Sequence, residues 1–176
     1  MSHDSTVRLG PGADRDKTSV GLYVALTVAA AMIAASAAQT SLLLSLPPWA
    51  MFMGWVAYFS RRPSAREGVQ SFACVLFGLC LGTLATMAIR QLVPIVGGAA
   101  LPLTVFGMAL IVIATRGLPI LNNLLGYFIG LITFFASHLD PELHSIVKLG
   151  GATALGSLAG WTAQTVEGKL RHLARA

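Results

Sequence analysis

The residues best suited to chemistry lie in one short polar loop, His138-Leu139-Asp140-Pro141-Glu142-Leu143-His144. Its two imidazoles and two carboxylates alternate along the chain, and in extended backbone alternate side chains share a face, as a zinc site requires. The same loop has the pattern of a helix start, with a capping Asp140, a proline in the first turn and Glu142 near the positive end of the helix dipole. A helix would scatter the ligands, so we expect a capped helix start with no bound metal and no cofactor.

Two neighbouring amides, Asn122 and Asn123, are predicted just inside an apolar segment. An amide in a membrane helix is costly unless it bonds to another helix or lines water, so both solute contact and a clamp between helices stay open. Thr133 is expected to bond back to the carbonyl of Ile129, four residues earlier. The apolar segments carry no Ser/His/Asp set, phosphate-binding glycine loop or paired carboxylates, so we expect no enzyme.

The composition is that of a membrane protein. Of its 176 residues 55% are hydrophobic and 11% are charged, against about 25% charged residues in soluble domains. The net charge of +5 comes from Lys and Arg in short loops and chain ends. Because no basic face with interleaved aromatics is present, this charge predicts orientation in a lipid bilayer and no nucleic-acid binding.

Six apolar segments are expected to be transmembrane helices, at about 19–44, 47–59, 64–89, 99–115, 119–137 and 141–165. The second follows Pro47-Pro48 and is too short to cross a hydrocarbon core of about 30 Å, so it is predicted to be short, kinked or broken. Ser64-Ala65-Arg66-Glu67 fits a capping box. Ala35-Ser36-Ala37 resembles a signal-peptidase site, but we expect a retained helix because the repeat described next needs it.

Two segments of this chain repeat one pattern, Phe52-Met53-Gly54-Trp55-Val56-Ala57-Tyr58-Phe59-Ser60 and Phe128-Ile129-Gly130-Leu131-Ile132-Thr133-Phe134-Phe135-Ala136. They share a phenylalanine, a glycine and an aromatic pair at a constant offset of 76 residues, and the expected helix caps Ser64 and Asp140 have the same offset. We therefore expect a first three-helix repeat at 19–93 and a second at 94–168. Because three spans is an odd number, the second repeat is predicted to be inverted, with the fifth span also short or broken.

The charges predict how the chain lies in the membrane. With the N-terminus inside, ten of the twelve Lys and Arg residues fall on the cytoplasmic side, and Arg90 and Lys148 fall on the other. This asymmetry follows the positive-inside rule and places both termini in the cytoplasm. Residues 1–18 are expected to form a flexible tail and residues 169–176 a short basic tail.

The chain resembles a small bacterial inner-membrane family known as a domain of unknown function, DUF1097. The resemblance rests on Trp49-Ala50 before Phe52-Met53-Gly54-Trp55 and Tyr58-Phe59, and on Gly126-Tyr127-Phe128-Ile129-Gly130 with Phe135-Ala136. It implies the inner membrane of a bacterium and six short spans, and it brings no substrate and no catalytic residue.

The function expected from these patterns is passage of a solute. No acidic, basic or histidine residue lies near the middle of an expected span, which favours a passive channel or facilitator for a small neutral or weakly polar solute, such as a urea- or amide-like one. The expected path is lined by Gly54, Trp55, Tyr58, Phe59, Asn122, Asn123, Gly130, Thr133, Phe134 and Phe135.

Three alternatives remain. The aromatic residues among these can instead form an interfacial belt or pack between helices. The protein can be a secondary transporter coupled to an ion, or a structural or partner-binding membrane protein with a closed, dry interior. Six short helices enclose little space, so we expect a homo-oligomer.

Overall fold

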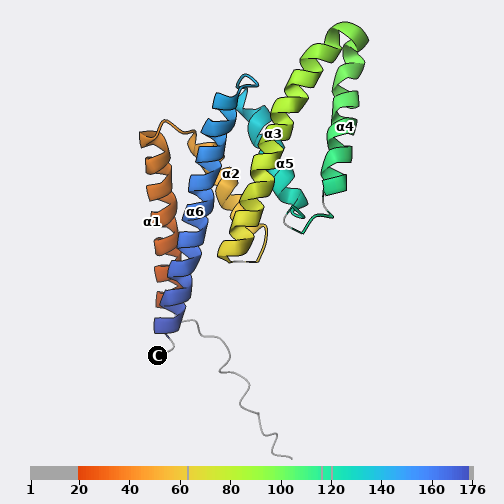
Figure 1. Ribbon diagram of the computed structural model, residues 1–176. Helices are drawn as coiled ribbons and strands as arrows, with labels where there is room; N and C mark the ends of the chain where they lie inside the picture. The colour runs from red at the N-terminus through yellow and green to blue at the C-terminus, as the bar shows by residue number, and fades with distance from the viewer. Residues whose placement is uncertain (1–19, 63, 116, 120, 175–176) are drawn as a thin grey trace, which may run out of the picture.

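The structure, a computed structural model, describes residues 20–62, 64–115, 117–119 and 121–174 (Figure 1). Within these ranges the chain forms six α-helices and one short 3-10 turn, without a strand. The helices are α1 (Val20–Leu43), α2 (Pro48–Phe59), α3 (Ala65–Val96), α4 (Ala100–Thr115), α5 (Leu124–Ser137) and α6 (Leu143–Leu173), with the turn η1 at Gly97–Ala99. The predicted all-α class is confirmed.

Successive helices run in opposite directions (Figure 1). We call the end where α1 begins and α6 finishes the terminal end. The α2–α3 and α4–α5 connections lie there, and the other three connections lie at the opposite, distal end. The three helices α1, α2 and α3 therefore run antiparallel to their counterparts α4, α5 and α6.

Two stretches are long and apolar enough to cross a membrane, Val20–Leu43 and Ala65–Thr115. The second contains α3, η1 and α4. The helix Leu124–Ser137 is apolar but shorter. The chain is thus helical and has membrane-type segments.

The second and fifth helices are short, as the sequence predicts. They contain 12 and 14 residues, which at about 1.5 Å per residue is less than the roughly 30 Å of a hydrocarbon core. The break before α2 occurs at the two prolines, because Pro47 is the N-cap and Pro48 is the first residue of the helix. Ser45 has a positive φ of 55° and reverses the chain after α1.

The predicted ends of the third and sixth spans are wrong. α3 does not stop near Ile89 but continues to Val96 with Pro94 inside it. Pro94 donates no hydrogen bond to the carbonyl four residues before it, and the helix ends two residues later. The chain turns instead at Gly97, whose φ of 56° suits glycine. α6 likewise continues beyond Thr165, so most of the predicted basic tail is helical.

One of the two predicted caps is confirmed and the other is wrong. The Ser64 hydroxyl accepts a hydrogen bond from the Glu67 backbone N–H at 3.1 Å and caps α3. The N-cap position of α6 is occupied by Glu142, not by Asp140, and Glu142 makes no side-chain capping bond. Asp140 pairs with Arg90 instead, at 2.9 Å. The carboxylate of Asp140 is thus engaged by a residue of α3 and does not cap the helix, which begins two residues later than the offset of 76 predicts.

The centre of the molecule is an apolar core where α2, α3, α5 and α6 meet. Its buried members are small or aliphatic side chains and one phenylalanine, namely Ala50, Ala57, Val75, Leu79, Ile129, Phe134, Leu149 and Ala152. α1 packs against α2 and α6 on one side, and α4 packs against α3 on the other (Figure 1). The four central helices therefore determine where the predicted site residues lie.

Candidate functional site

The two glycine-aromatic segments lie in two different helix pairs. The segment of α2 packs along α6, and the segment of α5 packs along α3. α2 and α5 also touch each other. The glycine and aromatic residues of the predicted path therefore lie in two different helix pairs that share the central core.

Glycines bring the backbones of α2 and α6 together. A Cβ atom on Gly54 would lie 1.9 Å from the backbone oxygen of Thr153, and one on Gly156 would lie 1.8 Å from the backbone oxygen of Met51. Non-bonded atoms do not approach so closely, so a side chain at either position would force the helices apart. Gly54 is thus a contact between helices.

α5 and α3 are joined in the same way. A Cβ atom on Gly130 would lie 2.2 Å from the backbone oxygen of Val75, and one on Gly78 would lie 2.3 Å from that of Tyr127. These four residues correspond to those of the first pair: positions in α2 and α5 differ by 76, and positions in α3 and α6 differ by 78. The same interlocking contact occurs twice.

The first residue of each aromatic pair is buried over a glycine. Tyr58 is 3% exposed and Phe134 is 2% exposed. The ring of Tyr58 covers Gly160 of α6, while the side chain of Phe134 covers Gly82 of α3. Tyr58 also donates a hydrogen bond of 2.6 Å from its hydroxyl to Oε1 of Gln164. These two aromatics hold their helices together.

The second residue of each pair faces outward. Phe59 is 50% exposed and Phe135 is 44% exposed, and each ring contacts its buried neighbour edge-on. Trp55 is partly buried against a cluster that contains Met51. The alternation favours packing or an interfacial belt for the outward rings, which is one of the alternatives that the sequence leaves open.

Thr133 has the partner that the sequence predicts. It is fully buried, and its hydroxyl donates to the carbonyl of Ile129 at 2.6 Å. The bond satisfies the hydroxyl within its own helix.

Asn123 lies at the start of α5, not inside it as predicted, and holds three helices together. Its Oδ1 accepts from the Gly126 backbone N–H at 3.3 Å. Its Nδ2 donates to the hydroxyls of Ser60 and Ser71 at 2.8 and 2.9 Å, and the Ser71 hydroxyl donates to the carbonyl of Ala57 at 2.5 Å. We call Ala57, Ser60, Ser71 and Asn123 the amide cluster. It joins the end of α2, the first half of α3 and the start of α5. Asn123 therefore acts as a clamp between helices, one of the two alternatives that the sequence leaves open.

Asn122 lies beside this cluster and is exposed. Its Oδ1 accepts from Arg61, which also pairs with Glu67. The contact links the α2–α3 connection to the residues before α5. Sequence reasoning missed Ser71 and the Arg61 pairs, because a single serine in an apolar run and an arginine in a charged loop carry no signal of their partners.

The polar loop before α6 does not gather its possible ligands. His138 ends α5 with a positive φ of 52°, Asp140 pairs with Arg90 and Glu142 occupies the N-cap position of α6. Across the described ranges no group of three or more His, Cys, Asp and Glu side chains is placed to hold a metal ion. The loop contributes a polar contact at the distal end, between α3 and the α5–α6 connection.

The protein-family model described as "Protein of unknown function (DUF1097)" matches residues 24–167. The chain therefore belongs to the DUF1097 family, as the aromatic and glycine patterns of its sequence indicate. No curated protein matches the chain, and no solved structure matches it.

The glycine contacts predict that Gly156→Ala is strongly destabilising. The added methyl group would meet a backbone atom of α2 that cannot rotate away, so we expect a loss at or above the about 1–3 kcal/mol typical of overpacking. The measurement is thermal unfolding of the purified protein in detergent. Gly168→Ala is the matched control on the same helix, because a Cβ atom there meets nothing within 4 Å. It should be neutral or slightly stabilising, and equal melting of both variants would contradict the contact.

The amide cluster predicts that Asn123→Ala costs about 1–3 kcal/mol. The change removes the α5 cap and leaves two hydroxyls short of a partner. Asn122→Ala is the control, since it removes an exposed contact worth about 0–1 kcal/mol. Unfolding in detergent distinguishes the two, and a larger loss for Asn122→Ala would refute the assignment.

Proposed function

We propose that this member of the DUF1097 family is an integral membrane protein with six spans, built as two inverted three-helix repeats at 19–93 and 94–168. The support is the opposite direction of the two sets of helices (Figure 1). It is joined by the recurrence of the glycine contacts at offsets of 76 and 78 residues. In each set the second helix is short.

The proposed location is the bacterial inner membrane, with both termini in the cytoplasm. The α2–α3 connection and the start of α3, at the terminal end, carry Arg61, Arg62 and Arg66, and the end of α6 carries Lys169 and Arg171. Arg90 and Lys148 lie in the parts of α3 and α6 nearer the distal end. An excess of basic residues at one end is what the positive-inside rule requires of the cytoplasmic side.

The proposed activity is passage of a small neutral or weakly polar solute, urea- or amide-like, by a channel or facilitator. The observation that carries it is the pair of matched short helices α2 and α5, which run in opposite directions and are packed by equivalent glycine contacts against α6 and α3. Short or broken helices in matching positions of inverted repeats are where membrane carriers and channels place their solute path.

Passage requires the two helix pairs, α2 with α6 and α3 with α5, to move against each other. The seam between the pairs is filled by the apolar core, and polar contacts cross it at both ends: the amide cluster and Arg61–Asn122 at the terminal end, Arg90–Asp140 at the distal end. Such contacts act as gates when one end opens while the other stays closed. A coupled secondary transporter is the variant of this proposal in which an ion gradient drives the same movement.

A second candidate is a structural or partner-binding membrane protein without transport. The apolar core favours it, because the described buried side-chain polar atoms all have hydrogen-bond partners and the seam is lined by apolar residues. Flux measurements separate the two candidates.

The topology predicts that reporters fused to the N- and C-termini both report the cytoplasm. A reporter inserted after Arg62 should also report the cytoplasm, and one inserted after Gly97 should report the opposite side. Protease protection in spheroplasts gives an independent readout. Termini on opposite sides would refute six spans.

The transport proposal predicts uptake into proteoliposomes above empty vesicles for at least one small neutral or weakly polar solute. A facilitator gives flux that does not respond to an ion gradient, and a coupled carrier gives saturable uptake that does. Absence of flux across a panel of solutes and ions would exclude transport and leave the second candidate.

If the ion pair between Arg90 and Asp140 is a gate at the distal end, its removal should change the flux. Arg90→Gln removes an exposed ion pair worth about 0.2–1 kcal/mol, so the rate should change by up to about fivefold. Glu167→Gln is the control, because it removes a similarly exposed pair with Arg171 inside α6. An equal effect of both variants would contradict a gate at the distal end.

A further inference from the structure

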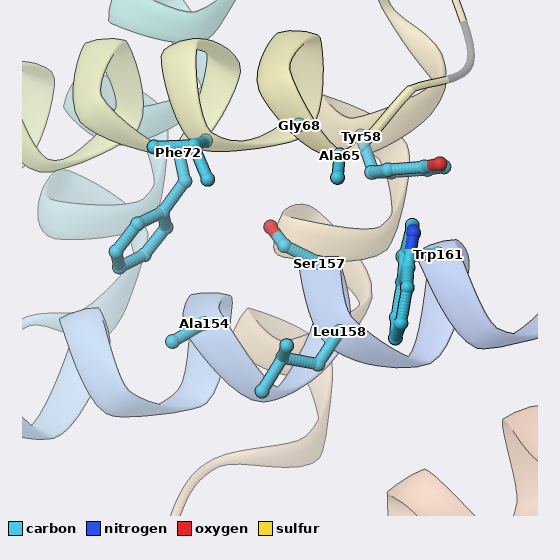
Figure 2. A pocket seen from close by; sticks show the side chains of 9 residues that line it. Tyr58, Ala65, Gly68, Phe72, Ala154, Ser157, Leu158 and Trp161 are labelled. Atoms are coloured by element: carbon cyan, nitrogen blue, oxygen red, sulfur yellow. The ribbon is translucent and has the colours of Figure 1, made fainter.

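An apolar groove lies between α3 and α6, closed at its base by α2. Its cavity has a volume of about 380 Å³. Figure 2 shows the rings of Tyr58, Phe72 and Trp161 around it, with Gly68 on the α3 side and Leu158 on the α6 side. Gly68 leaves the space for the Tyr58 ring, because a Cβ atom there would lie 2.8 Å from that ring. The groove is thus shaped by the same glycine-aromatic packing that joins the helices.

The groove suits a long apolar guest. The hydroxyls at its wall are turned to internal acceptors: Ser157 donates to the carbonyl of Gly54 at 3.1 Å, and Tyr58 donates to Gln164. The rim is open to the surroundings, since Val69 is 68% exposed and Leu158 is 60% exposed. A hydrocarbon chain would bury this surface without leaving a polar group unsatisfied.

Positive charge stands at the terminal end of the groove. Arg66 lies in the first turn of α3, beside the lining residues Ala65 and Val69. Lys169 follows Leu158 by eleven residues, about three helical turns, and so lies on the same face of α6. Neither residue forms an ion pair within the described part of the chain, whereas the nearby acids Glu67 and Glu167 are paired with Arg61 and Arg171.

We propose that this groove binds an anionic phospholipid, with one acyl chain along α3 and α6 and the phosphate at Arg66 and Lys169. The inference rests on the membrane orientation given under the proposed function, which puts these residues at the cytoplasmic surface. Basic residues at that depth attract anionic headgroups, and Trp161 is of the type that lies at the headgroup level. Because positive charge adjoins an apolar groove, the site fits an anionic lipid better than it fits an apolar helix of another protein.

The test is native mass spectrometry of the detergent-purified full-length protein, titrated with phosphatidylglycerol or phosphatidylcholine of equal chain length. Phosphatidylglycerol should bind more tightly, and Arg66→Gln and Lys169→Gln should each weaken it about fivefold, which corresponds to about 1 kcal/mol per basic residue. Lys148→Gln is the matched control, because Lys148 lies on α6 at the distal end. It should leave binding unchanged.

A second variant tests the apolar part of the site. Ala154→Leu places extra volume in the groove wall, so it should weaken both lipids while the melting temperature stays near that of the unaltered protein. Equal affinity for the two headgroups, or equal losses for Lys148→Gln and Lys169→Gln, would overturn the proposal. A dimer that Ala154→Leu dissociates would assign the groove to a second copy of the chain and would also overturn it.

The result is separable from the proposed function. If the protein stays in solution without detergent, the membrane assignment fails and the lipid site fails with it. If the protein requires detergent and transports solute but does not prefer phosphatidylglycerol, the lipid site alone fails. Preference for phosphatidylglycerol without any flux would support the site and exclude transport.

Discussion

The structure depends on the close approach of two helix pairs through glycine. Where α2 meets α6 and α5 meets α3, the place of a Cβ atom is already taken by a backbone oxygen of the neighbouring helix. Such contacts are the usual way to pack membrane helices, because apolar side chains gain little from leaving lipid and close backbones gain dispersion contacts. These contacts therefore hold α2 and α5 firmly although both helices are short.

The glycine contacts also arrange the aromatic side chains. Once the backbones touch, Tyr58 and Phe134 are the rings that fill the space over the next glycine along each partner helix, at Gly160 and Gly82. Each following residue is then turned outward, because neighbouring positions on a helix are about 100° apart. The pattern of Gly and two aromatics is thus accounted for by packing, and the same packing occurs in both helix pairs.

Polar residues are concentrated where the central core ends. The amide cluster lies near the terminal end, and Arg90 with Asp140 lies at the distal end. Between them the core shared by the two helix pairs, α2 with α6 and α3 with α5, is apolar, so sliding of one pair against the other there breaks few hydrogen bonds. This distribution concentrates the directional bonds between the two pairs at the two ends.

Several features follow from the sequence alone because their causes are local. Composition indicates the helical, membrane-type segments, the prolines at 47 and 48 break the chain, Ser64 caps its own helix and Thr133 bonds within its own turn. The repeat at an offset of 76 is likewise visible without coordinates.

Tertiary structure decided which surfaces those elements share. Gly54 meets a residue about a hundred positions away, Asn123 binds Ser60 at the end of α2 and Ser71 in α3, and Asp140 pairs with Arg90 while Glu142 takes the N-cap position of α6. None of these partners is encoded in local periodicity, since a helical period indicates which face is apolar but does not identify the neighbour that covers it.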